Sequence, residues 1–360
     1  MVDSREEREK CALARPVLEL GLRTVSHSFA RFDPALQWNT FQDNFMENAT
    51  TPLSGGFSFL SSFSLDPQDI DLNKVGFLGN VDEEYPLAVQ HGLYFGAYWL
   101  HYYTLIHVLY YVGALAFKIL FSMYNASAET LKISKELTAE QIRLSEIAFP
   151  LYSAVPALSN LCVRLGISKL KGSVEATGGL AVSVFNFLVY LFLVEGMIYY
   201  VHYWLLHKWK WGKEHLKHDV HHSYKHESEM FTWSGYAFEA IDGSLQGLPL
   251  VIGTLLVPIP SSFHIFSGAF VGVWTMYIHT GTVVSLPWPF MGSDYHLIHH
   301  GLNWYNFGLY TMFWDSLFGT LKHPSKKVDK LMKQAQEGGK SLEELHAMYH
   351  TDDIFKVKRK

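Results

Sequence analysis

Eight histidines of this chain fall into three closely spaced clusters. The first is His202-x4-His207, and the other two share the spacing His-x2-His-His. These repeated clusters consist of His218, His221 and His222, and of His296, His299 and His300. On an α-helix, at about 100° per residue, the three histidines of such a cluster project from one arc of roughly 100°. Crowded imidazoles cannot all be protonated because like charges repel, but neutral rings can share a cation. The clusters therefore predict a metal site.

The number of histidines predicts two metals. Imidazole nitrogen suits iron, copper, zinc and nickel, and a single zinc takes about four ligands. The eight clustered histidines exceed that number twofold. His279 is the best candidate for a ninth ligand, because it ends an apolar segment seventeen residues before His296. His215 is expected to be solvated or to contact a metal ligand without binding the metal itself. Whether His226 binds the metal is left open. Cys11 and Cys162 are far apart and supply no thiolate set.

The spacing of the first cluster requires an irregular backbone. His202 and His207 are five residues apart, and such residues diverge by about 140° on a regular α-helix. Either the backbone unwinds locally or the metals lie between the two rings. A metal-bound imidazole usually donates its second nitrogen to a carboxylate or carbonyl. Asp242 and Asp315 are the candidates for that role.

The composition indicates a membrane protein. Hydrophobic residues make up 49%, aromatic residues 15% and charged residues 18%, against a usual charged share of about 25%. The mean hydropathy is only +0.05, so water-facing segments must accompany the membrane part. The net charge of −5 gives no electrostatic basis for binding nucleic acid. We therefore expect membrane lipid, and no nucleic acid, around this chain.

The hydropathy along the chain predicts an all-α fold. We expect a polytopic membrane helical bundle with a cytosolic, histidine-rich helical cap that holds a di-metal site. Residues 1–86 form an N-terminal region of unknown role, and residues 87–175 a membrane span, a linker and a proline-containing apolar segment. Residues 176–324 carry all the histidine clusters, and residues 325–360 form a charged tail.

Four apolar segments are long enough to enter a bilayer, which about 20 helical residues cross. Leu87–Met123 predicts one long span. Ser145–Leu165 contains two prolines and is left open as a span, a re-entrant segment or an interfacial helix. Ala176–Leu206 predicts a span whose end carries the first histidine cluster beyond the bilayer. Tyr236–Tyr277 is interrupted by prolines and predicts two short spans joined by a turn.

The predicted hairpin places the second and third clusters on one membrane face, because a hairpin returns the chain to the side it left. Five lysines between Lys208 and Lys225 identify this face as cytosolic by the positive-inside rule. His264, beside the proline turn, is expected at the opposite interface. Lys356 and Lys358 near the carboxyl end fit a dilysine signal for return to the endoplasmic reticulum.

The histidine clusters, together with NFGLYTMFWDSLFGT at Asn306–Thr320, resemble the fatty acid hydroxylase and sterol desaturase superfamily. Within it, the sterol C5-desaturases are the most similar group. The similarity rests on IDGSLQGLPL at Ile241–Leu250, on YIHTG around His279 and on PFMGSDYHLIHH ending at His300. It extends over about Glu146–Pro324.

The resemblance implies a catalytic domain at 176–324 in the endoplasmic reticulum membrane, with its active site on the cytosolic face. It implies two non-haem iron ions held by the clustered histidines and His279. Electrons would come from NAD(P)H through cytochrome b5 and its reductase, and dioxygen would be consumed. The reaction implied is oxidation of the C5–C6 bond of a Δ7-sterol to a 5,7-diene, with water as the other product.

Two alternatives remain open at this point. The same clusters occur in related membrane hydroxylases, such as C4-methyl sterol oxidases and enzymes that act on acyl chains. A different class, a histidine-lined metal transporter or a haem-binding membrane protein, predicts histidines along a path across the bilayer. The gathering of the clusters at one face favours the enzyme.

Overall fold

The computed structural model describes residues 71–74, 79–123, 133–226, 228–280 and 286–336. These residues are mainly helical, and they contain isolated bridges but no sheet. The prediction of an all-α fold is confirmed. Most of the predicted region 1–86, together with Lys356 and Lys358, lies outside the described residues.

The longer helices in chain order are α5 (Leu87–Met123), α6 (Lys135–Arg164), α7 (Leu180–Tyr200), α9 (Ala240–Leu256), α10 (Ser261–Ile278), α11 (Ser293–Leu302) and α13 (Lys326–Gln336). The α-helices α4 (Val81–Glu84), α8 (Lys210–His215) and α12 (Phe313–Phe318) are short. A π-helix, η5 (Val201–Lys208), continues α7. The 3-10 turns are η2 (Leu72–Lys74), η4 (Glu175–Thr177), η6 (His221–Ser223) and η7 (Thr232–Tyr236).

Three of the described helices are long and apolar enough to cross a membrane: α5, α6, and α7 with its π-helical continuation. The outer surface of α7 shows why lipid is needed. Leu180, Phe185 and Leu188 are 65%, 66% and 61% exposed, and a soluble protein rarely leaves such large apolar side chains together on its surface. The chain is therefore a membrane protein with several candidate spans.

The proline-containing segment is one continuous helix, α6, with Pro150 and Pro156 inside it. Each proline lacks the N–H that would reach the carbonyl four residues earlier, yet the helix continues through both positions. Side chains bind other carbonyls of this turn: the Trp99 indole donates to that of Pro150 at 2.7 Å, and the Ser153 hydroxyl donates to that of Phe149 at 2.8 Å. A continuous helix does not dip in and return, and α6 is long and apolar enough to span a membrane.

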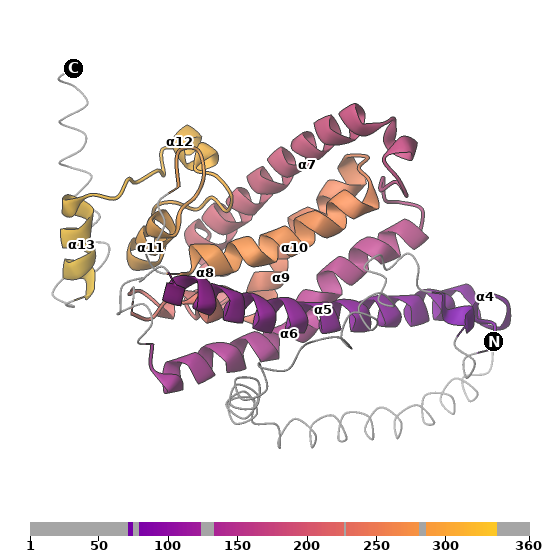
Figure 1. Cartoon of the computed structure of the whole chain (residues 1–360), viewed down its shortest axis with the longest axis horizontal. Coiled ribbons are helices and arrows are strands. Elements are labelled where there is room, and N and C mark those ends of the chain that lie inside the picture. Colours follow the sequence, from indigo (N-terminus) through magenta and orange to yellow (C-terminus); the bar gives the residue numbers. More distant parts are fainter. Residues whose placement is uncertain (1–70, 75–78, 124–132, 227, 281–285, 337–360) are drawn as a thin grey trace, which may run out of the picture. The chain divides into compact units, whose positions relative to one another are not determined.

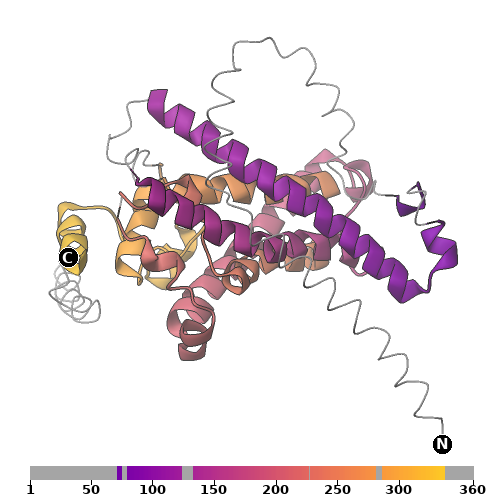
Figure 2. The ribbon, with the colours of Figure 1, turned by 90° about the horizontal axis from the view of Figure 1, so that it is seen from below.

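The predicted turn at the prolines is confirmed: α9 and α10 are joined at residues 257–260. Neither helix is among the three described helices that are long and apolar enough to cross a membrane. Figure 1 shows α9 and α10 among the other long helices. Figure 2, a view from below, shows α5 and α6 crossing the same bundle. Helix α6 contacts both α5 and α9, and α7 contacts α9. At Gly253 of α9 a Cβ atom would lie 2.6 Å from the Tyr190 ring of α7. Only glycine permits this close approach.

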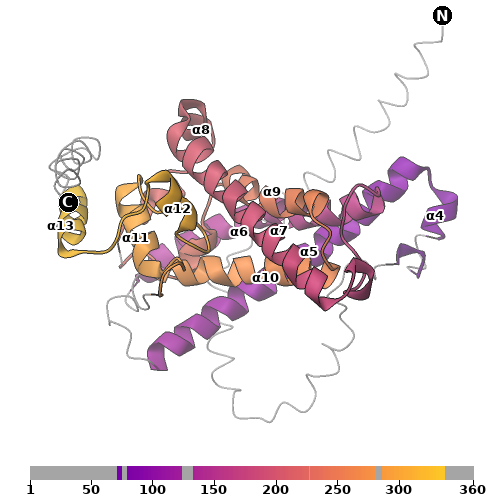
Figure 3. The ribbon, with the colours of Figure 1, turned by 90° about the horizontal axis from the view of Figure 1, so that it is seen from above.

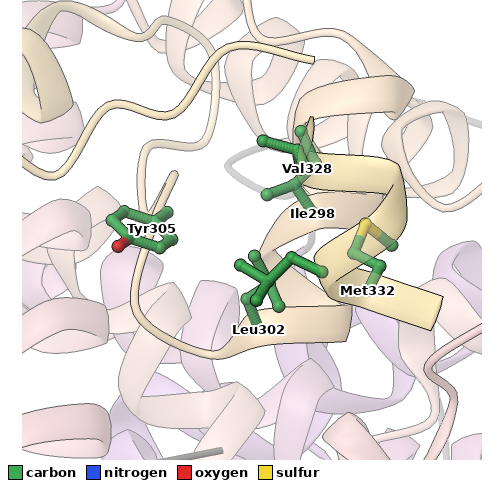
Figure 4. Packing of buried hydrophobic residues seen from close by; sticks show 6 residues of the cluster. Ile298, Leu302, Tyr305, Val328 and Met332 are labelled. Atoms are coloured by element: carbon green, nitrogen blue, oxygen red, sulfur yellow. The ribbon is translucent and has the colours of Figure 1, made fainter. Parts of the chain in front are cut away.

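Helices α11 to α13 follow the hairpin and close one end of the bundle (Figures 1 and 3). Figure 4 shows how α13 covers α11: Val328 and Met332 face Ile298 and Leu302 in one apolar cluster. Burying each such side chain contributes about 1.5–3 kcal/mol. The segment before α12 is fixed to α7, because the buried carboxylate of Glu195 accepts hydrogen bonds from the backbone and hydroxyl of Thr311.

Candidate metal centre

The first histidine pair lies on the π-helix that ends α7. His202 and His207 are both buried there, with ring centroids 5.1 Å apart. A π-helix pairs residue i with residue i+5, so it brings together side chains that a regular helix would separate. Of the two arrangements predicted for this spacing, local change of the backbone is the one observed.

The second cluster does not lie on a regular helix, so the prediction of one helical arc is wrong for it. His218 lies in a turn, and His221 and His222 begin the 3-10 turn η6. His218 and His222 face each other with Nε2 atoms 3.0 Å apart. His221 turns away and approaches His279 at the end of α10, again with 3.0 Å between Nε2 atoms.

The third cluster lies on α11 and divides in the same way. His296 and His300 are four residues apart and share one side of the helix, with Nε2 atoms 3.2 Å apart. His299 points to the other side, and its ring centroid is 4.5 Å from that of His202. Each repeated cluster therefore gives its first and third histidines to one group and its middle histidine to the other.

All nine predicted histidines lie in two adjacent buried groups. The first group contains His202, His207, His218, His222 and His299, and the second contains His221, His279, His296 and His300. In each group every histidine offers one ring nitrogen, and these nitrogens all lie within 4.8 Å of one another. Several closest pairs are 3.0–3.3 Å apart. Two nitrogens bound to one metal at about 2.1 Å lie roughly 3.0–3.4 Å apart, so these separations fit shared cations.

The outward nitrogens of five histidines are held by acceptors. Their Nδ1 atoms lie 2.7–2.9 Å from oxygens and must carry the proton, because carbonyls and carboxylates only accept. The pairs are His202 with the carbonyl of Phe307, His218 with Asp242, His279 with the carbonyl of Thr275, His299 with that of Tyr305, and His300 with that of Tyr224. The tautomers are inferred from these partners.

This proton arrangement directs lone pairs at one another. His279 and His300 are both protonated at Nδ1, so both Nε2 atoms are acceptors, yet they lie 3.3 Å apart. The Nε2 atoms of His207 and His299 are buried with no hydrogen-bond partner in the described part of the chain. Buried polar atoms rarely stay unpaired in a folded protein. A cation in each group would satisfy these nitrogens, so the residues present fit metal ions.

Burial keeps six of these histidines neutral. Two causes hold the pKa well below its usual range at five of them: removal from water is the larger, and repulsion from neighbouring imidazoles is the next. These five are His221, His222, His296, His299 and His300. Burial lowers the pKa of His279 to about 4. Neutral imidazole is the form that binds a metal, and these rings therefore have free lone pairs near neutral pH.

The two carboxylates predicted to orient ligands behave differently. Asp242, in the first turn of α9, contacts His218 Nδ1 at 2.7 Å, as expected. Asp315 contacts no histidine within the described residues and instead accepts hydrogen bonds at 2.8 Å from the backbone N–H groups of Phe307 and Gly308. It therefore fixes the loop whose Phe307 carbonyl holds His202. Burial raises the pKa of Asp315 to about 6.

The remaining histidines near the clusters lie outside both groups. His215 is exposed, and its Nδ1 lies 2.9 Å from the carbonyl of Trp211. His226 is half-buried and lines a second, polar cavity next to His222. Sequence reasoning missed the backbone carbonyls of Tyr224, Tyr305 and Phe307, which no side-chain pattern identifies. The nearest signal is the stretch at Asn306–Thr320, which follows the third cluster.

An apolar cavity of about 460 Å³ reaches both histidine groups. Helices α5, α6, α9 and α10 supply most of its walls, and His202, His221, His279 and His296 line it. Its size is usual for a cavity that encloses a small molecule.

His264, at the start of α10 and predicted at the opposite membrane interface, also lines this cavity. The side chain is buried, with its ring nitrogens 3.0 Å from the hydroxyls of Ser159 and Tyr190.

The fold and the site define a class: a helical membrane protein with two buried histidine groups at the end of an apolar cavity. The model of the fatty acid hydroxylase family matches residues 187–320, which include all nine histidines. The putative Δ7-sterol C5(6)-desaturase 2 of Arabidopsis thaliana is 32% identical over 239 residues, 66% of this chain and 84% of that protein. The Δ7-sterol C5(6)-desaturase of Nicotiana tabacum is 35% identical over 53% and 69% of the two chains. Lathosterol oxidase of Homo sapiens is 31% identical over 61% and 76%.

The chain therefore belongs to the fatty acid hydroxylase family, with the sterol C5-desaturases among its relatives, and it is an oxidoreductase. No solved structure matches it.

Proposed function

We propose that this chain is a di-iron, O2-dependent sterol C5-desaturase that introduces the C5–C6 double bond into a Δ7-sterol. The observation that carries the proposal is the apolar cavity, which is lined by histidines of both groups. A rigid, largely hydrocarbon substrate fits such walls. The printed names of the relatives, Δ7-sterol C5(6)-desaturase and lathosterol oxidase, supply the substrate class and the bond.

The histidines His202, His207, His218, His222 and His299 would hold one iron, and His221, His279, His296 and His300 the other. Bound iron would supply activation of dioxygen, which ordinary side chains cannot perform. In the balanced reaction, two hydrogens leave the sterol, and O2, two electrons and two protons together with them give two molecules of water.

The chain's own residues prepare this site in two ways. Asp242 and the backbone carbonyls fix the ring orientations and keep the Nε2 lone pairs directed inward. The apolar walls contributed by α5, α6, α9 and α10 keep bulk water from the reacting carbons, which protects reactive species from side reactions.

We further propose that electrons come from NAD(P)H through cytochrome b5 and its reductase, with the active site on the cytosolic face of the endoplasmic reticulum membrane. Five lysines from Lys208, the last residue of the π-helix, to Lys225 support this orientation. The sterol-oxidising relatives and the dilysine pattern at Lys356 and Lys358 support the compartment.

A second candidate in the same family is a hydroxylase acting on a C4-methyl sterol or an acyl lipid. The family model itself favours it, because its description is fatty acid hydroxylase. Hydroxylation and desaturation begin with the same hydrogen removal and differ in whether oxygen or a second hydrogen is transferred. The product therefore separates the two candidates.

Sterol profiling of a C5-desaturase-deficient cell that expresses this chain tests the proposal. We expect Δ7-sterols to fall and 5,7-dienes, identified by their ultraviolet absorbance, to appear. His299→Ala should insert into membranes yet form no diene, whereas His215→Ala, which changes an exposed histidine outside both groups, should retain activity. Hydroxylated sterols without diene would favour the second candidate. No change in the sterols would reject both sterol-directed readings.

A further inference from the structure

Five of the polar side chains that line the apolar cavity outside the histidine groups are engaged with the protein. Their hydroxyl, amide and imidazole groups make hydrogen bonds of 2.7–3.0 Å to neighbouring residues. This holds for Tyr102, Ser153, Ser244, Gln246 and His264. Such groups have little left to offer a ligand.

The hydroxyl of Tyr152 differs from these five groups. Its oxygen is buried and makes no hydrogen bond within the described residues. The backbone N–H of Phe238 lies nearby but already donates to the carbonyl of Tyr236 at 2.9 Å. The other buried lining atoms without a partner are Nδ1 of His221 and His296, which belong to the metal groups. Outside those groups, Tyr152 is therefore the described lining residue with a fully buried polar atom that has no partner.

Tyr152 occupies the histidine end of the cavity. A Cβ atom at Gly243 of α9 would lie 2.4 Å from the Tyr152 hydroxyl and 2.5 Å from two of its ring carbons. The residue before Gly243 is Asp242, whose carboxylate contacts His218. Glycine at position 243 thus lets the ring of Tyr152 pass α9. The Tyr152 hydroxyl also lies near the backbone of Phe238, whose ring stacks on His221 with centroids 3.6 Å apart.

An unpaired buried hydroxyl costs free energy unless a ligand completes it. We propose that the Tyr152 hydroxyl donates a hydrogen bond to the C3 hydroxyl of a sterol substrate and thereby fixes which carbons face the histidines. This inference rests on the proposed function. In a sterol, C3 and C5 are both bonded to C4, so a group that holds the C3 oxygen also positions C5 and C6.

The hydroxyl-bearing ring of the substrate therefore lies at the histidine end, and the alkyl tail extends along α10 towards His264. Helix α10 has 18 residues and is about 27 Å long at 1.5 Å per residue. It lines the cavity from His264 near its start to His279 just beyond its end. The cavity therefore has room for the alkyl tail of the sterol on the side that leads from Tyr152 towards His264.

The test compares binding of a Δ7-sterol with that of its 3-deoxy analogue, using radiolabelled ligands and the full chain in nanodiscs. The natural protein should prefer the hydroxylated sterol about tenfold, the worth of one buried neutral hydrogen bond. Tyr152→Phe should reduce the preference to less than about twofold. In turnover the same variant should raise KM for the hydroxylated sterol, with kcat changing less than KM.

Tyr102→Phe is the matched control, because it removes another hydroxyl that lines the cavity but accepts a hydrogen bond from Asn160 at 2.9 Å. It should keep the tenfold preference. A 3-keto analogue, which can accept but not donate, should bind the natural protein better than the 3-deoxy compound. This comparison needs no variant and stands even if Tyr152→Phe fails to fold.

An unchanged preference in Tyr152→Phe, or equal binding of all three ligands to the natural protein, would overturn the inference. These outcomes differ from failure of the proposed function. If the natural protein forms no diene but prefers the hydroxylated sterol through Tyr152, the desaturase reading fails while the hydroxyl site stands.

Discussion

Replacing Asp242 with asparagine tests how far the metal groups depend on one buried contact. The Asp242 carboxylate is fully buried and faces two donors, His218 Nδ1 at 2.7 Å and the amide of Gln246 at 3.0 Å. Both oxygens of the carboxylate are in use. Asparagine keeps the shape but has one oxygen, so its N–H2 group must face one of these donors.

The expected loss is 10- to 100-fold in metal affinity, the usual cost of disturbing the partner of a metal-bound histidine. That loss corresponds to about 1.4–2.7 kcal/mol at 1.36 kcal/mol per tenfold change. The assay equilibrates purified protein in nanodiscs with increasing chelator and measures the metal retained per chain by mass spectrometry. Asp242→Asn should lose half its metal at a 10- to 100-fold lower chelator concentration than the natural protein.

Glu239→Gln is the matched control. Glu239 precedes α9 and accepts a hydrogen bond from the N–H of Ile241 at 2.9 Å, and glutamine retains an oxygen for it. Among the described residues it contacts no histidine, so its metal retention should equal that of the natural protein. Superimposable retention curves for Asp242→Asn and the natural protein would refute the reasoning. An equal shift in both variants would assign the effect to the start of α9 and not to His218.

Three further predictions concern stability. Gly243→Ala should destabilise the protein by about 1–3 kcal/mol through overpacking, because its Cβ would meet Tyr152. Gly268→Ala, where nothing lies within 4 Å, should be neutral or slightly stabilising in thermal unfolding. Leu331→Ala should cost about 2–5 kcal/mol, because Leu331 is buried against α11, while exposed Lys330→Ala should change the melting temperature little. Burial raises the pKa of Asp315 from 3.8 to about 6, so the folded state binds the proton more tightly than the unfolded state. Its contribution to stability is therefore greatest below the unfolded pKa of 3.8 and falls by about 3 kcal/mol as the pH rises through 6. Asp315→Asn should remove this component from the pH dependence of unfolding, and equal pH profiles in the two proteins would contradict it.

The sequence was sufficient to identify the histidines and the hairpin that brings them together. Their spacing marked eight members of the two groups, the end of an apolar segment marked His279, and the prolines between α9 and α10 marked the turn. Both signals are local patterns of side chains. A general rule about metal-bound imidazoles also marked Asp242 as a candidate partner, but it did not identify His218 as the histidine that Asp242 contacts.

The division into two groups could not be predicted, because it depends on how separate elements face one another. A single helical arc suggested that His218, His221 and His222 act together, but a turn followed by a 3-10 helix sends His221 to the other group. The carbonyls that orient His299 and His300 belong to the backbone and carry no sequence signal. The unused hydroxyl of Tyr152 became visible only once the cavity and its neighbours were known.

Counting metal ions in the purified, membrane-embedded protein tests the central claim most directly. With nine buried histidines in two groups, mass spectrometry should find close to two irons per chain, and optical spectra should show no haem. One metal per chain, zinc in place of iron, or a haem spectrum would contradict the account.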